Sequence, residues 1–114
     1  MRILSEKAFE LKLNKRARLL GYWPIKLNPT WNKGLPDRLF VGPSGTTVFM
    51  ELKKKGTGRA SKLQDYYIRL LVMLGHNAYI VDDYDDAIKK LEAALLSSQS
   101  NQNDAGSGSG GAIP

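Results

Sequence analysis

Residues 34–53, GLPDRLFVGPSGTTVFMELK, decide the fold that the sequence predicts. Apolar and β-branched residues predict two strands, over 38–41 and 46–53. The Gly-Pro-Ser-Gly run at 42–45 lies between them and is typical of a turn. The segment therefore predicts an antiparallel hairpin.

Elements of both kinds are predicted on either side of this hairpin. Apolar residues at helical spacing predict three helices, over 5–20, 61–74 and 85–96. Short apolar runs predict two further strands, over 22–27 and 78–81. The predicted order is αβββαβα, which is an α/β fold with a mixed central β-sheet flanked by helices.

Composition sets limits on the class of protein. The chain has 114 residues, so one folded domain is expected, over 1–96. Residues 97–114 are polar and rich in glycine and serine, which predicts a disordered tail. The chain has no cysteine, which excludes disulfides and thiolate metal sites. The lack of cysteine also fits the expected cytoplasmic location. No apolar run reaches about 20 residues, so no membrane partner is expected.

Charge is distributed unevenly along the chain. Residues 1–62 contain fourteen lysines and arginines and four acids, whereas residues 63–114 contain three and seven. A basic half of this strength indicates a polyanionic partner, and nucleic acid is favoured over a membrane surface. A basic surface that only aids solubility is the alternative.

The second strand of the hairpin presents two charged residues on one face. Side chains alternate along a strand, so Glu51 and Lys53 point the same way, opposite to Val48, Met50 and Leu52. The hairpin can also bring Asp37 close to Glu51. Two carboxylates suit Mg²⁺, and an adjacent lysine can orient water and neutralise phosphate charge. An exposed Glu-x-Lys pair with no catalytic role is the alternative interpretation.

Carboxylates are scarce in the basic half, so each of them is informative. The four are Glu6, Glu10, Asp37 and Glu51. Glu6 and Glu10 are four residues apart and share one face of the first predicted helix. Metal ligation is one explanation for them, and ion pairing is the other, with Lys7, Lys12 or Arg38 as the partner.

The order of these motifs resembles a known nuclease family. GLPDR at 34–38, FMELK at 49–53 and SKLQ at 61–64 are similar to the GxPD, ExK and SxxQ motifs of VRR-NUC nucleases. The resemblance covers about residues 5–87. It implies the restriction-endonuclease-like core of the PD-(D/E)XK superfamily.

The resemblance also implies roles for individual residues. Asp37 and Glu51 would bind Mg²⁺ or Mn²⁺ together with the carbonyl of Leu52, and Lys53 would be the catalytic lysine. The family's helical glutamate matches Glu10 best, with Glu6 as the alternative. Gln64 would lie at the active site, although Ser61 and Gln64 also form a capping-box pattern, which needs no substrate.

Further basic residues are expected to contact DNA. They are Lys26, Lys33, Arg38, Lys54, Lys55, Arg59 and Lys62. The small phage and viral members of the family imply a Mg²⁺-dependent endodeoxyribonuclease that acts on branched DNA as a homodimer, in the manner of a Holliday junction resolvase. A phage or its bacterial host is the implied source. A nuclease for simple duplex or flap DNA, and a non-catalytic DNA-binding module, are the alternatives.

Overall fold

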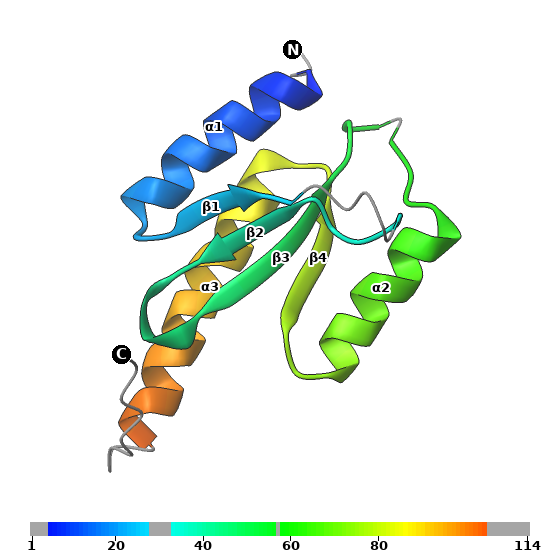
Figure 1. The fold of residues 1–114 in the computed structure, drawn as a ribbon. Coiled ribbons are helices and arrows are strands. Elements are labelled where there is room, and N and C mark those ends of the chain that lie inside the picture. Colours follow the sequence, from blue (N-terminus) through cyan, green and yellow to red (C-terminus); the bar gives the residue numbers. More distant parts are fainter. Residues whose placement is uncertain (1–4, 28–32, 57, 105–114) are drawn as a thin grey trace.

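A four-stranded sheet organises the chain (Figure 1). The computed structural model describes residues 5–27, 33–56 and 58–104. The strands lie in the order β1 (Trp23–Lys26), β2 (Arg38–Val41), β3 (Thr47–Leu52) and β4 (Asn77–Val81). The pairs β1–β2 and β2–β3 are antiparallel and β3–β4 is parallel, so the predicted mixed sheet and its central hairpin are confirmed.

Three helices flank the sheet: α1 (Glu6–Leu19), α2 (Lys62–Met73) and α3 (Tyr84–Asp104). A short 3-10 turn, η1 (Pro43–Gly45), closes the β2–β3 hairpin. Helix α1 contacts β1 and α3, whereas α2 contacts β4, so the two helices lie at opposite edges of the sheet (Figure 1). This arrangement confirms the predicted order αβββαβα. No helix of the described ranges is long and apolar enough to cross a membrane.

The core lies where one face of the sheet meets α1 and α3. Helix α1 buries residues at a spacing of four, because such residues share one face of a helix: Phe9, Leu13 and Ala17. The hairpin buries alternate residues, as expected for strands: Phe40, Val48, Met50 and Leu52. Helix α3 supplies Ala87, Leu91 and Ala94. Helices α1 and α3 therefore cover the apolar face of the hairpin. The first residue of β2 and the last residue of β3 lie at the same end of the sheet.

The last helix is longer than the sequence predicted. Helix α3 continues to Asp104, eight residues beyond the predicted end at Leu96. The Thr46 hydroxyl donates a hydrogen bond to the Ser98 hydroxyl at 2.5 Å, which ties the extra turns to the hairpin. The polar composition after Leu96 predicted no helix there, because a contact between distant segments leaves no local pattern in the sequence. Residues 105–114 lie outside the described residues, so a disordered tail stays a prediction there.

Tyr22 joins the end of α1 to α3. Its side chain is buried, and its hydroxyl donates a hydrogen bond to the Leu91 carbonyl at 2.7 Å. Burial, followed by the nearby Tyr79, raises the pKa of Tyr22 from 10.0 to about 12. The neutral phenol therefore contributes stability that is complete below pH 10 and is lost as the pH rises toward 12.

Tyr22→Phe is expected to lower the free energy of unfolding by about 1 kcal/mol at neutral pH, because the hydrogen bond is lost. Between pH 10 and 12 its stability should fall less steeply than that of wild type. Urea unfolding at a series of pH values measures both effects. Tyr66→Phe, at an exposed position, is the control. Parallel stability curves for Tyr22→Phe and wild type would contradict the argument.

Candidate active site

The hairpin register places Asp37 and Glu51 together at one end of the sheet. Arg38 pairs with Met50, so Asp37 and Glu51 are the next residues along the two strands. The Asp37 backbone N–H donates a hydrogen bond to the Glu51 carboxylate. The predicted proximity of the two acids is therefore confirmed.

Glu51 is a buried carboxylate beside a second acid. The residue is 7% exposed, on a strand whose neighbours are also buried. Burial raises the pKa of Glu51, the charge of Asp37 raises it further, and Lys53 lowers it. A nearby cation would stabilise the ionised form of Glu51 in these surroundings.

Lys53 supplies one such cation. Its Nζ lies 3.5 Å from Glu51 Oε2, and the side chain is 19% exposed. Its backbone N–H donates to the Val81 carbonyl at 2.9 Å, which continues the parallel ladder beyond the end of β3. Lys53 is thus held beside Glu51, and part of its side chain is exposed to solvent.

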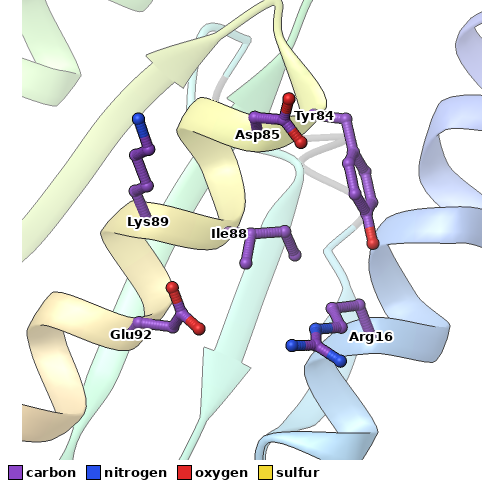
Figure 2. A pocket seen from close by; sticks show the side chains of 6 residues that line it. All are labelled: Arg16, Tyr84, Asp85, Ile88, Lys89 and Glu92. Carbon is purple, nitrogen blue, oxygen red and sulfur yellow. The ribbon is translucent and has the colours of Figure 1, made fainter.

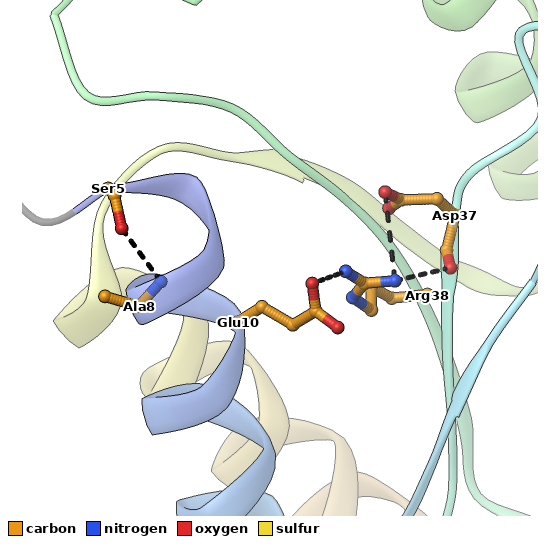
Figure 3. A network of polar contacts seen from close by, with 5 residues as sticks. All are labelled: Ser5, Ala8, Glu10, Asp37 and Arg38. Atoms are coloured by element: carbon orange, nitrogen blue, oxygen red, sulfur yellow. Dashed lines mark hydrogen bonds and ion pairs between the residues drawn. The ribbon is translucent and has the colours of Figure 1, made fainter.

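Arg38 links Asp37 to Glu10 of α1 (Figure 3). Its Nη2 is in direct contact with Glu10 Oε2, and its Nη1 lies 3.9 Å from Asp37 Oδ2. The same Nη1 donates to the Asp37 carbonyl at 3.1 Å. Arg38 itself is 4% exposed, so its guanidinium contacts other protein groups and not solvent. Glu10 therefore forms an ion pair with Arg38, which is one of the partners that the ion-pairing alternative named.

The donor set fits a hard divalent cation with few protein ligands. Asp37 and Glu51 are close enough for one charge to affect the pKa of the other. Mg²⁺ commonly takes one or two carboxylates and completes its coordination with water. No group of three histidine, cysteine, aspartate or glutamate side chains within the described ranges could hold a metal. Asp37 and Glu51 are the candidate ligands, and the roles of Glu10 and the Leu52 carbonyl stay predictions.

Other predicted site residues fall into two groups. Exposed cations lie on β1, in the loops and at the start of α2: Lys26, Lys33, Lys54, Arg59 and Lys62. Lys55 is also exposed, but its Nζ lies 2.5 Å from Asp83 Oδ1. Arg38 is buried, as described above, because it lies on the same inward face of β2 as Phe40. The side chain of Glu6 lies outside the described residues.

Gln64 takes part in a helix cap. Its backbone N–H donates to the Ser61 hydroxyl at 3.1 Å, and its side-chain oxygen accepts from the Ser61 N–H at 2.9 Å. Both bonds of the capping box are present, which confirms that interpretation. A role of Gln64 at the active site stays a prediction.

Gly34 packs the loop before Asp37 against α2. Its φ is +97°, and a Cβ there would lie 2.6 Å from Leu63 Cγ. Gly75 has a similar φ of +94°, but a Cβ there would meet nothing within 4 Å. The two glycines separate the effect of backbone strain from the effect of a close contact.

Gly34→Ala is expected to destabilise the protein by about 2–3 kcal/mol, because strain and overpacking add. Gly75→Ala should cost only about 1 kcal/mol, through strain alone. Thermal unfolding of the two variants compares them directly. Equal losses would show that Leu63 moves aside freely.

The sequence offered Arg38 as one possible ion-pair partner of Glu10, but it did not show that the same arginine also contacts Asp37. It also predicted a DNA contact for this residue. The available signal was its position in β2, two residues before the buried Phe40 and so on the same inward face.

Comparisons with known proteins bear on the family and the fold. No family model matches the sequence. The chain is 32% identical over 88 residues to "Putative nuclease p44" of Acyrthosiphon pisum secondary endosymbiont phage 1, which covers 75% of this chain and 90% of that protein. A solved "VRR_NUC domain" superposes with a TM-score of 0.69 and 25% identity, covering 76% of this chain and 94% of that one.

A second solved structure, "VRR_NUC domain protein", has the same TM-score of 0.69 at 15% identity and supports the fold alone, over 84% of this chain and 92% of that one. The fold is that of a nuclease with a PD-(D/E)XK-like core. Within that class, the chain belongs to the VRR-NUC family.

Proposed function

We propose that this nuclease is a Mg²⁺-dependent endodeoxyribonuclease selective for branched DNA, such as a four-way junction. The observation that carries the metal-dependent chemistry is the meeting of Asp37, Glu51 and Lys53 at one end of the sheet. Selectivity for branched DNA rests on the resemblance to the small resolvase-like members of the family. The proposed place of action is the cytoplasm of a bacterial cell, and the proposed source is a phage or its bacterial host.

Asp37 and Glu51 would hold the cation, with the Leu52 carbonyl as a further proposed ligand. A bound Mg²⁺ would neutralise phosphate charge and make water a better nucleophile, and Mn²⁺ would substitute for it. Glu51 suits this role because burial and the neighbouring acid make its isolated negative charge unfavourable.

Lys53 would act on the water and on the phosphate. Its ammonium lies beside Glu51 and has three N–H donors, so it would donate hydrogen bonds to both reactants. A fixed cation at this place stabilises the negative charge that develops on the phosphate oxygens. Arg38 would keep Asp37 and Glu10 in position rather than contact substrate, since it is buried between them.

The proposed active form is a homodimer, which would give the two active sites that paired incisions need. Helix α2 supports this assembly, because none of its residues is fully buried. Large apolar side chains at its ends and along it are exposed: Leu63, Tyr66, Val72, Met73 and Leu74. Apolar surface of this kind is typical of interaction sites. Sedimentation of wild type and Met73→Glu would test the interface.

Cleavage assays on labelled DNA test the proposed function. Four-way junction, flap and linear duplex are each incubated with Mg²⁺, with Mn²⁺ or with EDTA. Symmetric paired cuts in the junction, with little cutting of duplex and none in EDTA, are expected. Equal cutting of duplex would favour a simple nuclease, and cutting in EDTA would overturn the metal dependence.

A further inference from the structure

Helix α1 carries five cations that the proposed active site does not use. They are Lys7, Lys12, Lys15, Arg16 and Arg18. They fall into two groups on the helix surface, one toward α3 and one toward solvent.

The first group is engaged with α3. Lys12 Nζ lies 4.1 Å from the centre of the Tyr84 ring, at cation–π distance. Arg16 lines a groove between α1 and α3, together with the acids Asp85 and Glu92 (Figure 2). These two cations therefore have local structural surroundings that account for them.

The second group lies on the opposite side of the helix. Lys7, Lys15 and Arg18 are exposed, and their spacing of eight and three residues places them on one stripe. The stripe lies opposite the buried face of Phe9, Leu13 and Ala17. No ion pair joins these three cations to a carboxylate within the described ranges. The stripe is a row of positive charge open to a polyanion.

The stripe begins near the active site and runs away from it. Glu10 of α1 contacts Arg38, which contacts Asp37 (Figure 3). Lys15 and Arg18 follow Glu10 by five and eight residues, which is about 7.5 and 12 Å at 1.5 Å per residue. Since a DNA strand advances about 3.4 Å per base pair, these distances correspond to about two and four base pairs.

We infer that the outer face of α1 is a docking surface for one duplex arm of the DNA, with Lys7, Lys15 and Arg18 on its phosphates. This inference rests on the proposed function. It adds that one DNA arm would lie on the outer face of α1 and run along the helix away from the active site. The loop after β3, which carries Lys54, Lys55 and Arg59, leads toward α2 at the opposite edge of the sheet. This loop and the outer face of α1 would therefore hold DNA on either side of the active site. Leu11 and Leu19 are also exposed on this side of α1, so anionic membrane is included below as a competing partner.

Binding of a matched pair of variants tests the surface. Lys15→Gln/Arg18→Gln removes two charges from α1, and Arg69→Gln/Lys89→Gln removes two exposed charges from α2 and α3. Affinity for a labelled four-way junction is measured in EDTA, over a range of salt concentrations. The α1 variant should bind about tenfold more weakly, and its log–log salt slope should fall by about two. The control should stay within about twofold of wild type.

Two results would overturn the inference. Equal losses in the two variants would mean that only net charge matters, and an α1 variant that binds as wild type would mean that α1 does not touch DNA. Vesicles containing phosphatidylserine are tested in parallel, and loss of vesicle binding without loss of DNA binding would make a membrane the partner. Because binding is measured without cleavage, this outcome is independent of whether the junction is cut.

The arm's direction can be mapped separately, since the chain has no cysteine of its own. Lys15→Cys and Arg18→Cys each receive a tethered iron chelate that cuts nearby DNA. Scission by the Arg18 probe should lie farther from the junction centre than scission by the Lys15 probe, and an Arg69→Cys probe on α2 should not cut this arm. Coinciding or reversed positions would contradict an arm that runs along α1.

Discussion

Lys53→Met is expected to lower the rate of DNA cleavage by about 10³-fold while leaving junction binding within about threefold of wild type. Methionine keeps the length and the apolar stem of lysine and removes only the ammonium that lies 3.5 Å from Glu51. Loss of one fixed group that stabilises developing charge typically costs 10²–10³-fold in rate. Binding is distributed over many exposed cations and should survive.

Single-turnover cleavage with saturating Mg²⁺ measures the rate, and fluorescence anisotropy in EDTA measures binding. Lys89→Met, which removes an exposed charge on α3, is the matched control and should cleave normally. Cleavage by Lys53→Met at the wild-type rate would refute the proposed mechanism. A parallel loss of rate and binding would make Lys53 a DNA contact instead.

Glu51→Gln is expected to abolish cleavage and to raise the melting temperature of the metal-free protein by about 5 °C. Burial and Asp37 both disfavour the ionised Glu51, as its raised pKa indicates. Glutamine has nearly the same shape and can still accept the hydrogen bond from Asp37. Replacing a buried charge in this way often stabilises a protein, and about 1 kcal/mol corresponds to several degrees for a domain of this size.

The metal response gives this prediction a second readout. Mg²⁺ should raise the melting temperature of wild type but not that of Glu51→Gln, because binding to the folded state stabilises it. Glu92→Gln, at an exposed position on α3, controls for the general loss of an acid. A lower melting temperature for metal-free Glu51→Gln would show that the ion pair with Lys53 outweighs burial.

Local sequence was sufficient for most of the fold. The 34–53 segment predicted a hairpin whose first strand has the bounds observed for β2, Arg38–Val41. The turn residues at 42–45 and the alternation around Val48 and Met50 are short-range signals, so they could be read directly. The predicted final helix ended too early, at Leu96, because its extension depends on a contact between Ser98 and Thr46. These residues are 52 positions apart, which no local pattern records.

The sequence by itself determined the residue types of the candidate site and their order: an acid before one strand, and an acid and a lysine at the end of the next. Tertiary structure decided their surroundings. It buried Glu51 beside Asp37, which raises the pKa of Glu51, and it turned Arg38 inward to Glu10 of α1. It also divided the cations of α1 between α3 and solvent. Burial and charge pairing depend on segments far apart in the chain, and they act through space, so only the packed fold could determine them.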